Sequence, residues 1–94
     1  MQDLFSLKGK TALVTGGSTG IGAMIAEGFV NFGAKVYIAA RREEMLKQKQ
    51  EELAEIGPCE YIVADVGSVA GIKRLSETYG EREQSLDILV NNAG

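Results

Sequence analysis

The chain has 94 residues and a formal net charge of −3; 45% of its residues are hydrophobic and 24% are charged. This length allows one small domain, and the weak acidity argues against a nucleic-acid groove or an anionic membrane as partner. The sequence has no apolar run long enough for a membrane span or a signal peptide. Its single cysteine, Cys59, fits a reducing setting, so we expect a cytoplasmic protein.

The first half of the chain predicts two strand–helix pairs. The apolar run TALVT at Thr11–Thr15 is typical of a strand covered on both faces, and a helix is predicted over Gly20–Phe32. The positions of this helix expected to face the sheet are Ile21, Met24, Ile25, Phe29 and Phe32. KVYIAA at Lys35–Ala40 predicts a second strand, and a second helix is expected over Arg42–Ile56. The positions of the second helix expected to be buried are Met45, Leu46, the stem of Lys49, Leu53 and Ile56.

The second half repeats the alternation. EYIVA at Glu60–Ala64 predicts a third strand, and Ser68 is expected to cap a third helix. The apolar positions of that helix are Val69, Ile72, Leu75 and Tyr79. LDILV at Leu86–Val90 predicts a fourth strand, whose Leu89 we expect to remain partly bare. This order of elements predicts an α/β fold with a doubly wound parallel sheet, strand order 3-2-1-4 and three helices.

A glycine-rich loop, TGGSTGIG, separates the first strand from the first helix. Gly16, Gly20 and Gly22 follow the spacing G-x-x-x-G-x-G. Bare backbone at a helix N-terminus leaves N–H groups open to an anion such as a pyrophosphate. In a doubly wound sheet the ligand crevice lies at the carboxyl ends of strands 1 and 4, where this loop and the terminal NNAG both fall.

Two other glycine-rich sites are excluded by the residues around the loop. A P-loop needs Lys and then Ser or Thr after its last glycine, whereas Ala23 and Met24 follow Gly22. A methyltransferase-type site needs an acidic residue after the second strand to hold a ribose. The chain has Ala40 and Arg41 there.

Three motifs give the chain its resemblance to a known family. They are T-G-x-x-x-G-I-G at Thr15–Gly22, the Asp65–Val66 pair after the third strand, and N-N-A-G at Asn91–Gly94. In this order they resemble the N-terminal part of the classical short-chain dehydrogenases/reductases, most of all the 3-oxoacyl-[acyl-carrier-protein] reductase branch. The resemblance implies that residues 1–94 form the N-terminal part of a single Rossmann-type dinucleotide-binding domain.

The resemblance also assigns the cofactor-binding residues. They are Gly16, Ser18, Thr19, Gly20, Ile21, Gly22, Arg41, Asp65, Val66, Asn92, Ala93 and Gly94. The glycine loop would line the pyrophosphate and the adenosine ribose, and the last three residues would pass the nicotinamide-side ribose. Asp65 would accept a hydrogen bond from the adenine amino group, with Val66 beside the ring.

Arg41 bears on which cofactor is bound. An acidic residue at this place would hold a ribose 2′-hydroxyl, whereas a guanidinium binds phosphate oxygens in a fork. We therefore expect NADP(H), with NAD(H) less favoured. Thr19 stands where many phosphate-preferring relatives have Arg or Lys, which reduces the expected preference.

The family's catalytic residues are not found in this sequence. The family's serine and its Tyr-x-x-x-Lys pair follow the N-N-A-G motif. Tyr37, Tyr61 and Tyr79 are followed four residues later by Arg41, Asp65 and Glu83. We therefore predict that these 94 residues alone do not reduce carbonyl compounds, because the proton donor is missing.

The resemblance implies that the full-length parent is an oxidoreductase that transfers hydride between NADPH and a keto or acyl-thioester substrate. It also implies a homo-oligomer, with no nucleic-acid or membrane partner. No metal site is expected, because the chain has no histidine and a single cysteine, Cys59. The alternative is a module that binds a dinucleotide or a partner protein without catalysis.

Overall fold

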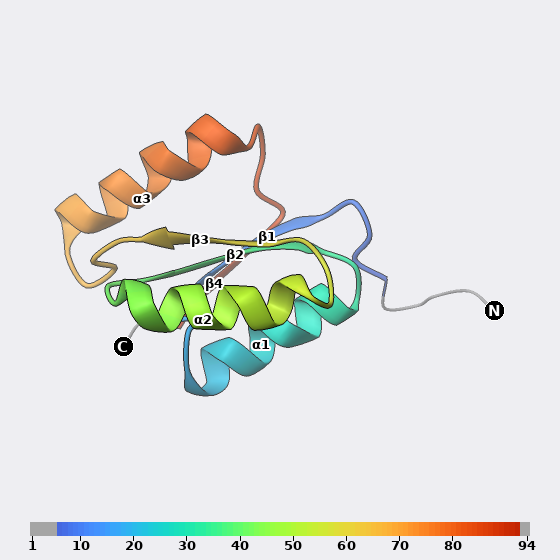
Figure 1. Cartoon of the computed structure of the whole chain (residues 1–94). Coiled ribbons are helices and arrows are strands. Elements are labelled where there is room, and N and C mark those ends of the chain that lie inside the picture. Colours follow the sequence, from blue (N-terminus) through green and yellow to red (C-terminus); the bar gives the residue numbers. More distant parts are fainter. Residues whose placement is uncertain (1–5, 93–94) are drawn as a thin grey trace.

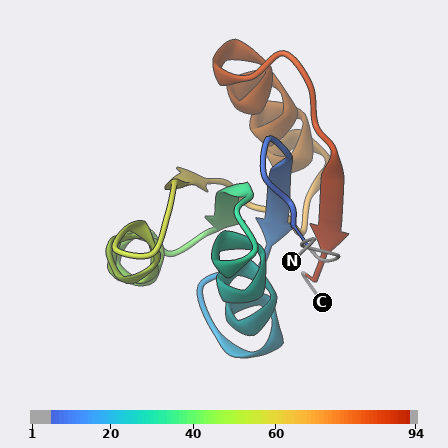
Figure 2. The same ribbon diagram turned by 90° about the vertical axis from the view of Figure 1, so that its right-hand side faces the viewer.

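The computed structural model describes residues 6–92, which form a sheet with helices on both faces (Figures 1 and 2). The strands are β1 (Thr11–Thr15), β2 (Lys35–Ala40), β3 (Cys59–Val63) and β4 (Ile88–Asn91). The helices are α1 (Gly20–Asn31), α2 (Glu43–Ala54) and α3 (Val69–Arg82). All strand pairs are parallel, in the order β3-β2-β1-β4. The predicted fold class and strand order are confirmed.

Alternation along the strands divides the core into two layers. Val36 and Ile38 of β2 face α1 and α2, whereas Tyr37 and Ala39 face α3. The first layer contains Ala12, Val14, Ala26, Val30, Ala34, Val36, Ile38, Leu46, Leu53 and Cys59. The second contains Leu13, Tyr37, Ala39, Ile62, Ala64, Leu75 and Tyr79. Apolar residues on both sides of each central strand explain why the sequence shows continuous apolar runs there.

The predicted sheet-facing side of α1 is wrong for three of its five residues. Ile21, Met24 and Phe32 are 67%, 73% and 51% exposed. The positions that α1 buries are Gly22, Ala23, Ala26 and Val30. A Cβ on Gly22 would collide with the carbonyl oxygen of Gly16, so the helix lies too close to the end of β1 to admit large side chains. Ile25 and Phe29 are partly buried against the core, as predicted.

The other two helices bury part of each predicted face. α2 buries Leu46 and Leu53, and α3 buries Leu75 and Tyr79. Val69 and Ile72 of α3 are exposed. Within residues 6–92, α3 is the only helix on its face of the sheet. Leu89 of β4 is 60% exposed, which confirms the bare position expected there.

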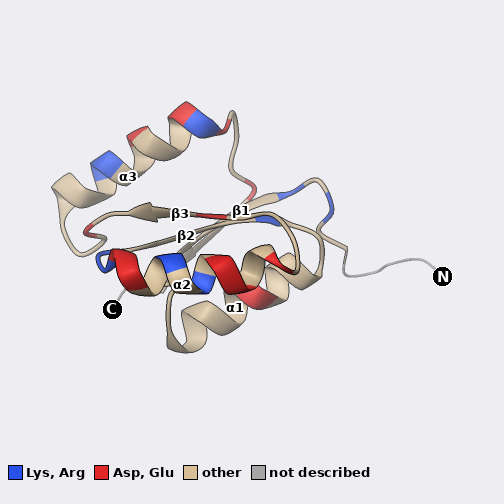
Figure 3. Ribbon diagram, in the orientation of Figure 1, with Lys and Arg blue, Asp and Glu red and all other residues tan. Residues whose placement is uncertain are grey.

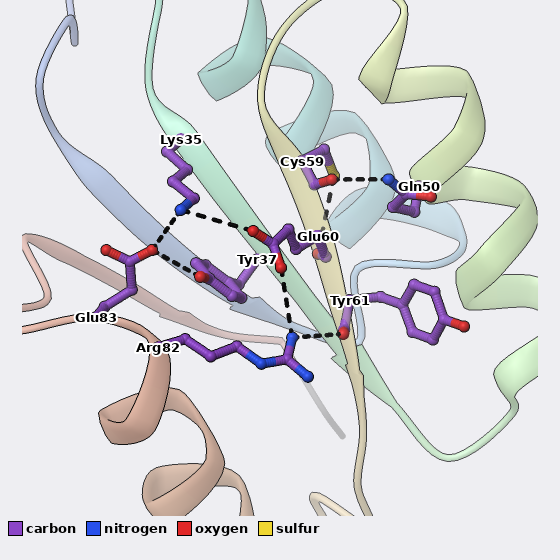
Figure 4. Close-up of polar contacts among 8 residues, drawn as sticks. All are labelled: Lys35, Tyr37, Gln50, Cys59, Glu60, Tyr61, Arg82 and Glu83. Carbon is purple, nitrogen blue, oxygen red and sulfur yellow. Dashed lines mark hydrogen bonds and ion pairs between the residues drawn. The ribbon is translucent and has the colours of Figure 1, made fainter.

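Charged residues join the end of α3 to the amino ends of β2 and β3 (Figure 4). We call this group the Glu83 cluster; it consists of Lys35, Tyr37, Glu60, Arg82 and Glu83. Oε2 of Glu83 lies 2.6 Å from Nζ of Lys35 and accepts a 2.6 Å hydrogen bond from the Tyr37 hydroxyl. Glu60 lies 3.6 Å from Lys35 and 3.5 Å from Arg82. These contacts fix α3 against the sheet at the edge opposite the carboxyl ends of the strands.

The chain's single cysteine, Cys59, is buried. Burial raises the pKa of the Cys59 thiol to about 12, so the side chain remains a neutral, buried thiol at the start of β3.

Within residues 6–92, none of the helices combines the length and the apolar character needed to cross a membrane.

Candidate functional site

A cleft of about 840 Å³ lies at the carboxyl edge of the sheet. The loops that follow all four described strands contribute to it. Its lining residues are Gly16, Ser18, Thr19, Gly20, Ile21, Ala40, Arg41, Arg42, Met45, Asp65, Val66, Gly67 and Asn92. The crevice expected at this edge is therefore present, and it brings together residues that lie up to 76 positions apart in the chain.

Most of the predicted site residues line this cleft. Those that do are Gly16, Ser18, Thr19, Gly20, Ile21, Arg41, Asp65, Val66 and Asn92. Gly22 is buried beneath the loop and does not line it. Ala93 and Gly94 lie outside the described residues.

The glycine loop opens the N-terminus of α1 to the cleft. Gly16 and Gly20 have φ values of 69° and 60°, which a residue with a side chain adopts only with strain. The N-cap residue Thr19 makes no side-chain hydrogen bond to the helix, and the first turn of α1 contains no acidic residue. The first N–H groups of α1 and the positive end of its dipole therefore remain available to an anion.

A buried hydroxyl ties the loop after β4 to β1. Oγ1 of Thr15 lies 3.0 Å from Oδ1 of Asn91 and 3.3 Å from the carbonyl oxygen of Val90, and can donate to either. The same oxygen accepts a 3.0 Å hydrogen bond from the backbone N–H of Asn92. A Cβ on Gly22 would lie 2.8 Å from Nδ2 of Asn92, so the amide packs directly over this glycine. Asn92 is thereby fixed above the start of α1.

The side of the cleft next to α2 is basic. Arg41 and Arg42 are exposed in the segment that leads into α2, where Figure 3 shows a short basic stretch directly before the acidic first turn of the helix. Glu43, in the first turn of α2, accepts a 2.9 Å hydrogen bond from the Tyr61 hydroxyl, so its carboxylate is engaged with β3. The charged residues that line the cleft on this side are Arg41 and Arg42, and the carboxylates of Glu43 and Glu44 follow them in the first turn of α2 without lining it.

Sequence reasoning left some lining residues unassigned. Met45 was expected in the core, but it is exposed and lies in the first turn of α2 beside the arginines. Gly67 follows Asp65 and Val66, and its backbone N–H donates a 3.0 Å hydrogen bond to Oδ1 of Asp65. The spacing Asp-x-Gly in a loop is a signal that could have identified this turn.

The chain's three tyrosines are engaged away from the cleft. The hydroxyl of Tyr37 donates to Glu83, that of Tyr61 to Glu43, and that of Tyr79 to the carbonyl oxygen of Ser85 at 2.7 Å. Burial, together with the hydrogen bond to Glu83, raises the pKa of Tyr37 to about 12. Lys35 is near Tyr37, but both belong to the Glu83 cluster at the opposite edge of the sheet. No tyrosine among residues 6–92 lines the cleft.

The cleft combines groups that suit an anion with a volume of about 840 Å³. Among the described residues, no group of three or more His, Cys, Asp or Glu side chains could hold a metal ion. The cleft instead combines open helix N–H groups, two guanidinium groups and one carboxylate. Phosphate oxygens suit the first two, and an amino group suits the third.

Comparison with known proteins gives close relatives over almost the whole chain. A 3-oxoacyl-[acyl-carrier-protein] reductase of rhamnolipid biosynthesis from Pseudomonas aeruginosa is 51% identical over 94 residues, which is 100% of this chain and 37% of that protein. A probable 2,4-dienoyl-CoA reductase from Caenorhabditis elegans is 47% identical over 94% of this chain and 29% of its own length.

Solved structures show the same arrangement of elements. The Pseudomonas aeruginosa RhlG/NADP active-site complex superposes with a TM-score of 0.95 at 51% identity, over 100% of this chain and 38% of that one. L-Sorbose reductase from Gluconobacter frateurii, solved with NADPH and L-sorbose, gives a TM-score of 0.90 at 36% identity, over 96% of this chain and 35% of its own.

The chain thus spans between 29% and 38% of the length of these relatives. The sequence profile of the short chain dehydrogenase family matches residues 10–94. With this match and the shared fold, the chain belongs to the short chain dehydrogenase family.

Proposed function

We propose that this chain forms the N-terminal, cofactor-binding portion of an NADP(H)-dependent short-chain oxidoreductase. The observation that carries the proposal is the convergence in one cleft of the open α1 N-terminus, Arg41, Asp65 and Asn92. In this proposal residues 1–94 are part of a single dinucleotide-binding domain, which continues in the full-length protein.

Each part of the cleft has a role matched to its chemistry. The loop Gly16–Gly22 binds the pyrophosphate through the N–H groups of α1, and Gly22 allows this loop and Asn92 to close over the helix. Arg41 binds the 2′-phosphate, and Asp65 accepts a hydrogen bond from the adenine amino group, with Val66 against the ring. The nicotinamide ribose is assigned to Asn92, together with Ala93 and Gly94, which lie outside the described residues.

The bound NADP(H) supplies or accepts the hydride. The residues of this chain bind and orient it; the proton donor for a carbonyl oxygen is not among them, because no tyrosine of residues 6–92 lines the cleft. Relatives named as reductases of 3-oxoacyl-[acyl-carrier-protein] and of L-sorbose support a keto or hydroxy substrate for the full-length protein. A homo-oligomeric state and a cytoplasmic location stay predictions.

The same tyrosine arrangement favours a second candidate, a dinucleotide-binding module without catalysis. The two candidates make different predictions for the full-length protein. NADPH binding with turnover of a 3-oxoacyl thioester supports the oxidoreductase, whereas binding without turnover of 3-oxoacyl thioesters or simple ketones supports the module.

The test of the cofactor assignment compares affinities for NADPH and NADH in the full-length protein. One charge-assisted hydrogen bond contributes about 1.5–3 kcal/mol, so we expect roughly a 10- to 150-fold preference for NADPH. Thr19 places the expectation at the lower end, because it adds no second cation to the glycine loop. The preference should decrease with added salt, since both arginines are exposed.

Arg41→Ala is expected to remove most of this preference. Lys47→Ala is the matched control, because it removes one positive charge from an exposed position of α2 that does not line the cleft. An unchanged NADPH-to-NADH ratio in Arg41→Ala would contradict the role of Arg41. Failure of the wild-type protein to bind either dinucleotide would overturn the proposed function itself.

A further inference from the structure

The first turn of α3 lies directly on Asp65. Gly71 is buried in this turn, and a Cβ there would overlap the carbonyl oxygen of Asp65. The Cβ added at position 71 would also lie 2.7 Å from the carbonyl carbon of Asp65 and 3.0 Å from the Cβ of Asp65. These atoms belong to the backbone and to the root of the Asp65 side chain, so no flexible side chain can move aside. Glycine at position 71 is what allows α3 to approach Asp65 this closely.

Ser68 joins the two residues by hydrogen bonds. Its Oγ accepts a 3.0 Å hydrogen bond from the backbone N–H of Gly71 and caps α3. The same hydroxyl donates to the carbonyl oxygen of Asp65 at 3.4 Å, and so does the backbone N–H of Ser68, also at 3.4 Å. The backbone of Asp65 is therefore held by the helix that follows it.

The carboxylate of Asp65 is oriented by the same short loop. Oδ1 accepts a 3.0 Å hydrogen bond from the backbone N–H of Gly67, two residues later. This contact fixes the rotation of the carboxylate with respect to the backbone that Ser68 and Gly71 hold. Asp65, Val66 and Gly67 all line the cleft, so the loop that holds the carboxylate forms part of its wall.

We propose that Ser68 and Gly71 are positioning residues that set the selectivity of the cleft for adenine. They hold the Asp65 carboxylate where it accepts a hydrogen bond from the 6-amino group of the base. The inference rests on the proposed function, in which Asp65 faces the adenine. A fixed acceptor favours a base with an amino group at position 6, and it repels one with a carbonyl oxygen there. Hypoxanthine, which differs from adenine at this position, is therefore the discriminating probe.

The experiment compares NADP⁺ with its hypoxanthine analogue, nicotinamide hypoxanthine dinucleotide phosphate, on the full-length protein. Dissociation constants are measured for both, and the readout is their ratio. Loss of one hydrogen bond to a charged acceptor predicts roughly a 10-fold or greater preference for NADP⁺ in the wild type. Gly71→Ala is expected to bring the ratio toward unity, because the added methyl group displaces Asp65.

Gly80→Ala is the matched control for Gly71→Ala. It makes the same change in the same helix, at a position where a Cβ meets nothing within 4 Å. Its ratio is expected to equal that of the wild type. Ser68→Ala and Ser68→Thr form a second pair, which remains informative if Gly71→Ala fails to fold. The alanine variant should lower the ratio, and threonine, which keeps the capping hydroxyl, should restore it.

The outcomes separate the inference from the function on which it rests. Equal weakening of both dinucleotides by Gly71→Ala and Ser68→Ala would show a merely structural role and overturn the inference. A wild-type ratio near unity would also overturn it, while leaving NADP(H) binding intact. Binding of neither dinucleotide by the wild type would overturn the proposed function first.

Discussion

The backbone N–H of Asn92 lies 3.0 Å from Oγ1 of Thr15 and donates a hydrogen bond to it across 77 positions of the chain. Thr15 is almost completely buried, so its hydroxyl is shielded from water, whereas Asn92 is exposed. One hydroxyl at the end of β1 therefore holds the loop after β4 at the cleft. The two outer motifs of the sequence, which begin at Thr15 and Asn91, are physically joined at this point.

Thr15→Val should destabilise the protein and weaken cofactor binding together. Valine keeps the shape of threonine but leaves the Asn92 N–H without its acceptor, at an expected cost of about 1–3 kcal/mol in the free energy of unfolding. Denaturant unfolding and NADPH titration of the full-length protein measure the two effects. Thr15→Ser keeps the hydroxyl and is expected to retain most of both. Equal stability of Thr15→Val and the wild type would show that the hydrogen bond is replaced by water.

Glu83→Gln should reduce stability in a way that depends on pH. Hydrogen bonds from Lys35 and then from Tyr37 lower the pKa of Glu83 below its ordinary value of 4.5. The folded protein therefore binds this proton less readily than the unfolded chain, so the stabilisation is full above pH 4.5. It is lost as the pH falls through the lowered pKa of the folded state.

Near neutral pH we expect Glu83→Gln to lower the free energy of unfolding by about 1–2 kcal/mol. This value is at the low end for charged hydrogen bonds because the Lys35 side chain is 37% exposed. Below pH 4.5 the difference from the wild type should shrink. Denaturant unfolding at a series of pH values measures both effects. Glu81→Gln, at an exposed position of α3, is the control and should show little change. If Glu83→Gln is less stable than the wild type by the same amount from neutral to acidic pH, the role of the carboxylate charge is contradicted.

Two glycines of α1 should respond oppositely to the same substitution. Gly22→Ala places a methyl group against the Gly16 carbonyl oxygen and is expected to destabilise by about 1–3 kcal/mol. Gly28→Ala meets nothing within 4 Å and should stabilise by roughly 0.5–1 kcal/mol, because alanine favours the helix. Denaturant midpoints compare the two variants. If both variants shift the midpoint in the same direction, close packing of α1 is not what requires Gly22.

The sequence was sufficient to predict the strands, because a sheet covered on both faces demands apolar residues throughout its central strands. Strand order followed from right-handed crossovers, which leave few alternatives. The observed boundary of a strand differs from the predicted one where a polar contact determines where the strand begins. β4 begins at Ile88, two residues later than predicted, because Asp87 pairs with Thr11 through both its backbone N–H and its Oδ2.

The face of α1 could not be predicted from periodicity. Size and hydrophobicity favoured Ile21 and Met24 as buried positions, but the close approach of the helix to β1 requires Gly22 and Ala23 there. That approach is a property of the assembled loop and sheet, not of the helix alone. The Glu83 cluster was missed for a related reason. It joins residues of β2, β3 and the end of α3, and no local spacing connects them.

The position of the Glu83 cluster has a consequence for engineering. β2 begins at Lys35, in this cluster, and ends at Ala40, which lines the cleft, so the length of the strand separates the two by about 16 Å. Substitutions separated by this distance, with no shared partner, usually combine additively. Mutations near Lys35 could therefore raise or lower thermal stability, while mutations near Arg41 change the affinity for the nucleotide independently. The usual trade-off between stability and activity would then not apply.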